Sequence, residues 1–98
     1  MAFLRICVRV ARIEGKCVVF EEGDEFVIEG PYLKSSKPVC VHAIGALLSL
    51  LSAATHGTSL KELGLTTNEV GYLTCPDPGP PYTPGGRVLF ELRVEPAT

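Results

Sequence analysis

The sequence predicts an α+β fold: a small, curled and mostly antiparallel sheet of four to five strands, or a half-barrel, packed against one main helix and a one-turn helix. Three observations predict it. Residues 4–11 and 87–94 alternate apolar and polar side chains, which is typical of half-buried strands. Between them, residues 41–54 repeat apolar side chains at helical spacing. One such helix covers one face of a sheet.

Four strands are expected along the chain, with a further short extended segment at residues 17–20. In the first strand, inward positions 4, 6, 8 and 10 place Cys7 on the outer face beside Arg5 and Arg9. Residues 25–29 form the second strand, with Phe26 and Ile28 inward, and Gly30 ends it. Residues 70–75 and 87–94 form the last two strands, and turns are expected at 14–16 and 21–24.

The main helix is expected to begin at residues 35–38, because a serine followed by a proline in the first turn is a helix-start signal. Gly57 is expected to end it. Residues 59–62 match a capping box for a one-turn helix that Gly64 closes. The predicted apolar stripe of the main helix consists of Val41, Ile44, Leu48 and Leu51, with Leu47 and Ala54 beside them.

Composition limits the classes of function. The 98 residues predict one domain, residues 1–98, and a net charge of −2 without any Lys/Arg run argues against a nucleic-acid partner. No segment reaches the roughly 20 apolar residues of a membrane span. Arg5 and Arg9 interrupt the apolar start of the chain, so no secretory signal is expected. The expected location is cytoplasmic, where cysteines serve as thiols, metal ligands or redox pairs.

Three of the four cysteines, Cys17, Cys40 and Cys75, lie at junctions where regular elements begin. We expect the fold to bring these junctions together at one end of the domain. Three thiolates, with Asp77, Asp24 or solvent as the fourth ligand, can hold zinc, iron or an iron–sulfur cluster. Two alternatives remain open, because no Cys-x-x-Cys motif is present: the cysteines are small core residues, or they act as a thiol/disulfide pair.

Cys40 is expected in the first turn of the main helix, where the helix dipole and free amides lower a thiol pKa. His56 follows 16 residues later, roughly 24 Å along the axis at ~1.5 Å per residue, so one ion cannot bind both. His42 is about 200° around the helix from Cys40 and is expected to point away from it.

The loop from Pro76 to Gly86 contains five of the eight prolines and Tyr82. It is expected to be stiff, either as a docking surface for a protein partner or second copy, or as a rigid hairpin connection. The acidic residues at positions 21, 22, 24, 25 and 29 lack the alternating oxygen pattern of a calcium loop and are expected to be solvated.

Several short motifs resemble a family of small prokaryotic proteins of about this length that has no established activity. They are Lys16-Cys17, Gly23-Asp24-Glu25-Phe26, Cys40 with His42-Ala43, Cys75-Pro-Asp-Pro78 and Val88-Leu-Phe-Glu91. The resemblance spans nearly the whole chain and implies that the three cysteines belong together. This chain departs from the pattern by lacking a glycine between Cys17 and Gly23, and an aromatic–proline pair in the helix.

Two functions are therefore expected from the sequence. The first is a small binding module whose three-cysteine site works through a metal or through thiols. The alternative is a homo-oligomeric interaction module with core cysteines and the proline-rich loop as its contact surface. No phosphate-binding loop, nucleophile elbow or placeable carboxylate pair points to a particular enzyme class.

Overall fold

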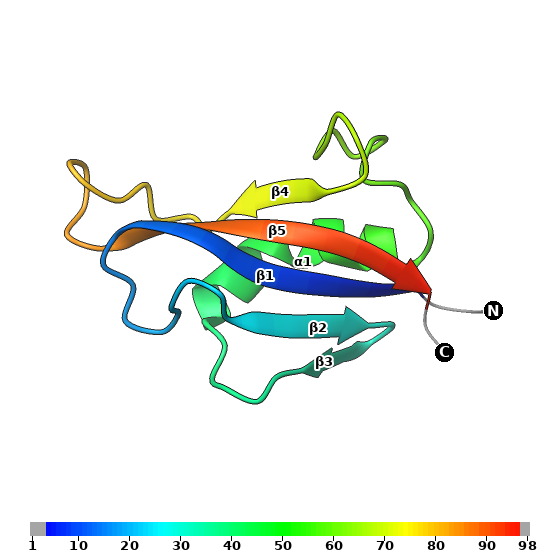
Figure 1. Ribbon diagram of the computed structural model, residues 1–98, viewed down its shortest axis with the longest axis horizontal. Helices are drawn as coiled ribbons and strands as arrows, with labels where there is room; N and C mark the ends of the chain where they lie inside the picture. The colour runs from blue at the N-terminus through cyan, green and yellow to red at the C-terminus, as the bar shows by residue number, and fades with distance from the viewer. Residues whose placement is uncertain (1–3, 97–98) are drawn as a thin grey trace.

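One antiparallel five-stranded sheet organises the chain. The structure is a computed structural model that describes residues 4–96. The strands are β1 (Leu4–Gly15), β2 (Glu25–Glu29), β3 (Tyr32–Lys34), β4 (Gly71–Thr74) and β5 (Gly86–Pro96). They are ordered β3-β2-β1-β5-β4, and α1 (Val41–Thr55) packs on one face (Figure 1). The predicted α+β class is confirmed, with an open sheet.

The two long central strands, β1 and β5, pair along their whole length, and β1 runs further than the alternation in the sequence predicts. Their register shifts between Val10 and Arg12, so Ala11 is an extra residue in β1. This bulge restores the apolar phase, because Ile13 then pairs with Val88 and packs against the core. Without it Arg12 would point into the core, since successive strand residues face opposite sides.

The core lies between α1 and the inner face of the sheet. Of the inward positions predicted for the first two strands, Ile6, Val8 and Val10 in β1 and Phe26 and Ile28 in β2 are buried, and Leu4 is half-buried. Buried residues of the last strand are Val88, Phe90 and Leu92. Phe20 reaches this core from outside the sheet, with ring centroids 6.1 Å from Phe26 and 5.5 Å from Phe90.

One strand has no signal in the sequence. Gly30 and Pro31 turn the chain into a hairpin instead of ending the sheet there, and β3 pairs with β2. All three residues of β3 are exposed, so they carry no alternation of apolar and polar side chains.

The main helix begins later than predicted. Ser35 does not cap it: its hydroxyl accepts the Lys37 N–H (3.2 Å) and donates to the Lys37 carbonyl (2.7 Å), closing a local turn. Cys40 is the N-cap, with an extended backbone (φ −68°, ψ 121°). The proline at position 38 therefore precedes the helix rather than lying in its first turn.

The buried face of α1 differs from the predicted stripe. Its buried residues are Ala43, Leu47, Leu51, Ala54 and Thr55. Val41 is 74% exposed and Leu48 is 50% exposed, so the prediction was wrong for these two. Apolar residues lie nearly all round this helix, and two stripes shifted by one residue then have the same helical spacing.

Two short predicted elements are turns in the structure. Residues 17–20 bend and do not form a strand. Residues 59–65 form hydrogen-bonded turns in place of the predicted one-turn helix, although the Glu62 N–H donates to the Ser59 hydroxyl (3.1 Å) as a capping box requires. Within residues 4–96, no helix has both the length and the apolar character that crossing a bilayer requires.

Candidate functional site

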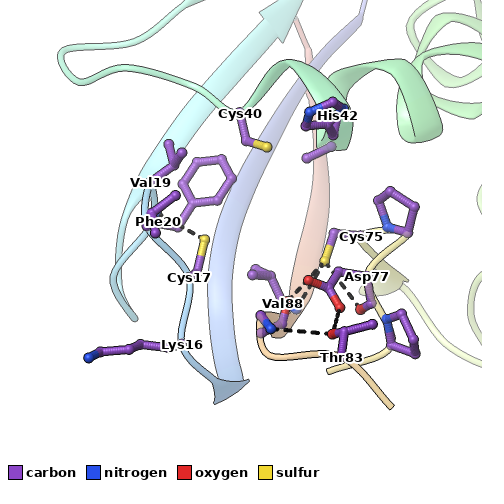
Figure 2. A pocket seen from close by; sticks show the side chains of 16 residues that line it. Lys16, Cys17, Val19, Phe20, Cys40, His42, Cys75, Asp77, Thr83 and Val88 are labelled. Carbon is purple, nitrogen blue, oxygen red and sulfur yellow. Dashed lines mark hydrogen bonds between the residues drawn. The ribbon is translucent and has the colours of Figure 1, made fainter. Parts of the chain in front are cut away.

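Three connecting segments meet at the end of the sheet where β1 stops and β5 begins (Figure 1). They are residues 16–20 after β1, residues 40–43 at the start of α1, and residues 75–86 between β4 and β5, and they enclose a cavity of about 520 Å³. Cys17, Cys40, Cys75 and Asp77, the residues predicted for the site, all line this one cavity, and its walls are largely apolar (Figure 2).

Cys17 is positioned by the core. The buried Phe20 ring anchors the bend after β1 among the phenylalanines, and the Phe20 backbone N–H donates to Cys17 Sγ at 3.3 Å. This bond fixes the position of the Cys17 sulfur at the bend that follows β1.

Cys75 is tied to the start of β5. Its backbone N–H donates to the Val88 carbonyl (3.0 Å), and the Val88 N–H donates back to Cys75 Sγ (3.3 Å). The thiol also contacts the carbonyl oxygens of Gly86 (3.6 Å) and Asp77 (3.8 Å) as a donor. The sulfur is therefore fixed between two backbone segments, in contact with both a donor and acceptors.

Cys40 differs from the other two, because its thiol makes no hydrogen bond within residues 4–96. Its carbonyl accepts the Ile44 N–H (3.1 Å), which begins the helix. Figure 2 shows the sulfurs of Cys40, Cys17 and Cys75 facing the same space from different sides. His42 also lines the cavity, contrary to prediction. The predicted separation of about 200° around the helix assumed that both residues are helical. It does not apply, because Cys40 has an extended backbone and only the residues after it are helical.

Asp77 organises the loop between β4 and β5. Its Oδ1 accepts the Thr83 hydroxyl and the Gly79 N–H (2.9 Å). The hydrogen bond from Thr83, followed by that from Gly79, lowers the pKa of Asp77 below its ordinary value. A Cβ on Gly85 would lie 2.0 Å from Oδ2, so only glycine leaves the carboxylate its place. One oxygen of this predicted ligand is thus engaged by the loop itself.

Two of the three segments are in direct contact. The Lys16 N–H donates to the Gly85 carbonyl (3.4 Å), and a Cβ on Gly86 would lie 2.8 Å from the Lys16 backbone. Glycine at position 86 therefore allows the Cys17 and Cys75 segments to approach closely.

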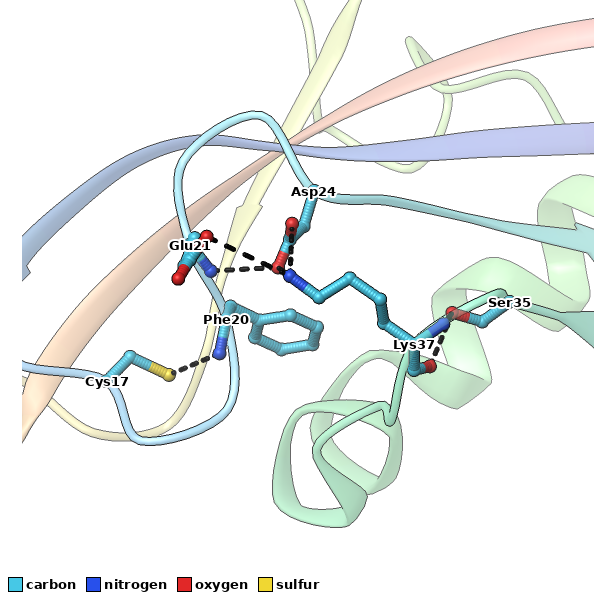
Figure 3. A network of polar contacts seen from close by, with 6 residues as sticks. All are labelled: Cys17, Phe20, Glu21, Asp24, Ser35 and Lys37. Carbon is cyan, nitrogen blue, oxygen red and sulfur yellow. Dashed lines mark hydrogen bonds and ion pairs between the residues drawn. The ribbon is translucent and has the colours of Figure 1, made fainter.

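Asp24, the other predicted carboxylate ligand, lies outside the cavity lining. Its oxygens accept the Glu21 N–H (2.8 Å) and bind Lys37 Nζ at 2.9 and 3.1 Å (Figure 3). The Glu21 bond, then the Lys37 bond, lowers the pKa of Asp24, and Asp24 raises the pKa of Lys37. Asp24 therefore fastens the turn before β2 to the segment that leads to Cys40.

The remaining cysteine and histidine lie away from the cavity. Cys7 is on the outer face of the sheet, as predicted, where its thiol donates to Glu25 Oε2 (3.7 Å). Burial, then the charge of Glu25, raises the pKa of Cys7. His56 caps the opposite end of α1, which agrees with its exclusion from a site that contains Cys40.

Among the described residues, no three His, Cys, Asp or Glu side chains form a group that could hold one metal ion. The metal role of the three cysteines therefore stays a prediction. Sequence reasoning missed Lys16, Phe20 and His42 as part of the lining. Phe20 could have been identified from the sequence, because aromatic side chains bury a large apolar area and are therefore expected in the core.

Comparison of the chain with protein-family models, with curated proteins and with solved structures finds no match. The resemblance to a small prokaryotic family stays a prediction.

Proposed function

We propose that this chain is a small binding module whose cavity holds a soft or thiol-reactive group between Cys17, Cys40 and Cys75. The observation that supports this most directly is the shared cavity: three cysteines remote in sequence, from three segments, line one largely apolar space of about 520 Å³. A concave apolar pocket with a few convergent polar groups is the usual form of a ligand site. All three cysteines are half-buried and also pack against the hydrophobic core.

Alkylation of the metal-free, reduced protein with N-ethylmaleimide tests the proposal. Mass spectrometry of peptides follows each thiol separately. An adduct on one cavity cysteine fills shared space, so it is expected to slow reaction at the other two several-fold. Cys7 is the matched internal control, because it lies on the outer face and should react at a rate independent of the cavity. Independent rates at all four thiols would contradict a shared binding site.

The alternative, an interaction module, is favoured by a separate observation. Val18 and Tyr82 are the most exposed large apolar side chains within residues 4–96, at 98% and 80%, and they belong to two of the segments that form the cavity. A partner or second copy docking at this end would cover both. Tyr82→Ser is expected to weaken such an assembly and to leave the coupling between the thiols unchanged.

A further inference from the structure

We infer that the group held between the three cysteines belongs to an uncharged, carbon-rich small molecule, which binds in the cavity and extends the hydrophobic core at that end of the sheet. The inference rests on the proposed function, because it names the class of ligand for the same cavity. The volume of about 520 Å³ lies within the range of roughly 300–1,000 Å³ that is usual for small-molecule sites.

The cavity is continuous with the hydrophobic core. Phe20, Ala43 and Val88 line it, and each of them is a buried member of the core. The three cysteines lie against the same core. An uncharged cysteine behaves as a small hydrophobic side chain, so the sulfurs belong to this apolar surface. Apolar cavities in proteins bind small apolar molecules such as benzene, because the ligand supplies the packing contacts that the walls lack.

The hydrogen-bonding groups beside two of the sulfurs are already paired. The Phe20 and Val88 N–H groups donate to Cys17 Sγ and Cys75 Sγ, both at 3.3 Å. The Cys75 thiol in turn has two backbone carbonyl oxygens as acceptors. A ligand with many polar groups would leave most of them without a partner in such a cavity, which costs free energy. The walls therefore favour a molecule with few polar groups.

The charged residues of the lining do not favour a charged ligand. Asp77 is held within its own loop by the Thr83 hydroxyl and the Gly79 N–H, which compensate its charge, and the same charge would repel an anion. Lys16 and His42 are exposed, and Figure 2 shows the Lys16 side chain directed away from the three sulfurs. Moving a charge from water into an apolar space without a partner is costly, so the ligand is uncharged.

Three probes of nearly the same shape and different charge test the inference: 2-phenylethanol, 2-phenylethylammonium and phenylacetate. The natural chain is expected to bind 2-phenylethanol, as measured from the Phe20 and Val88 amide signals in an NMR titration. It should bind each of the two ions about tenfold more weakly or worse, because neither finds an available opposite charge in the cavity. Equal or tighter binding of either ion would overturn the inference.

Cys40→Phe tests whether 2-phenylethanol binds inside the cavity. The Cys40 thiol makes no hydrogen bond within residues 4–96, so the substitution removes no polar contact and fills the space with a ring. It should weaken binding by about tenfold or more, because the ring occupies the volume that the ligand needs. Leu48→Phe places the same ring at a half-exposed position of α1 outside the lining, and it should bind as the natural chain does. Unchanged binding in Cys40→Phe would overturn the inference.

Alkylation of the natural chain gives a readout that does not depend on whether a variant folds. Saturating 2-phenylethanol should slow the reaction of N-ethylmaleimide with Cys17, Cys40 and Cys75 several-fold and leave the rate at Cys7 unchanged. If the three thiols are coupled without the probe, yet 2-phenylethanol neither binds nor protects them, the ligand class is wrong and the binding module stands. If the thiols react independently and 2-phenylethanol gives no protection, both are wrong.

Discussion

At the scale of single residues, two aspartates take similar structural roles in different places. Asp77 holds the loop between β4 and β5, and Asp24 holds the turn before β2. In each case a carboxylate accepts hydrogen bonds from nearby groups, which stabilises its charged form and lowers its pKa. Sequence position alone suggested a ligand for both, because it does not show which donors lie close.

The charge of Asp77 should make stability depend on pH. Its pKa in the folded chain is lowered from the ordinary value of 3.8, so its contribution is complete above that value and is lost as pH falls through the lower folded-state pKa. Asp77→Asn should therefore be less stable than the natural chain at neutral pH, with the difference shrinking in acid. Urea unfolding at several pH values measures this. Glu69→Gln, at an exposed position, is the control. A difference that is constant with pH would contradict the prediction.

The Lys37–Asp24 pair gives a second prediction at this scale. In Lys37→Met the pKa of Asp24 should rise, because the bond from the ammonium group is lost. The rise should be incomplete, since the Glu21 N–H, the larger cause of the lowered pKa, still donates. Carboxyl chemical shifts of Asp24 followed through an acid titration by NMR test this. Lys61→Met, in the turn that follows α1, is the control, and an unchanged Asp24 pKa in Lys37→Met would contradict the prediction.

At the scale of elements, the strands with alternating side chains could be predicted, and the segments without a pattern could not. Residues 4–10 and 25–29 alternate and were placed correctly, whereas β3 is exposed throughout and gives no signal. The bulge at Ala11 hid the second half of β1. The meeting of the three cysteine junctions was predictable from where they fall between elements. How closely the three segments approach one another was not predictable, because it depends on contacts between loops, such as that of Gly86 with the Lys16 backbone.

Two substitutions in α1 test which of two apolar stripes faces the core. Leu47 is 1% exposed, so Leu47→Ala should lower the free energy of unfolding by about 2–5 kcal/mol, through lost burial and a cavity. Leu48→Ala, one residue along, should cost less than about 1 kcal/mol because half of that side chain is already in solvent. Urea unfolding of the two variants compares them directly. Equal losses of unfolding free energy in the two variants would instead favour the predicted apolar stripe, which contains Leu48.

The contact between the two cavity loops can be tested in the same way. Gly86→Ala places a Cβ 2.8 Å from the Lys16 backbone and should cost about 1–3 kcal/mol, with faster alkylation of Cys17 as the segments separate. Gly45→Ala is the matched control, since nothing lies within 4 Å of a Cβ there. It should stabilise the chain by roughly 0.5–1 kcal/mol, because alanine is the better helix former. Destabilisation by both would show that the contact is not specific.

At the scale of the whole molecule, α1 covers one face of the sheet and the other face carries charge. Arg5 lies between Glu29 and Glu95 on neighbouring strands, with nitrogen–oxygen distances of 3.9 and 3.6 Å. Arg93 Nε donates to Glu91 at 2.8 Å on the same face. Opposite charges on adjacent strands suit a face in contact with water. The outer edge of β3 differs, because Tyr32 and Leu33 are exposed there.

Assembly is the prediction that belongs to this scale. The expected homo-oligomer should have a mass in light scattering that is a multiple of the 10.5 kDa chain. If copies join through the exposed end loops, Tyr82→Ser should lower that mass. If they join through the β3 edge, Leu33→Lys should lower it instead, because a charge on an edge strand opposes strand pairing. A chain that stays at 10.5 kDa at every concentration would contradict assembly.

The register of β1 and β5 also has a practical consequence. Leu4 pairs with Pro96, while Gly15 pairs with Gly86 about a strand's length away, beside the cavity. A tether attached near either end of the described chain would thus leave the cavity mouth facing free solution. Candidate small molecules in solution could then reach the cavity of the immobilised protein without obstruction by the support.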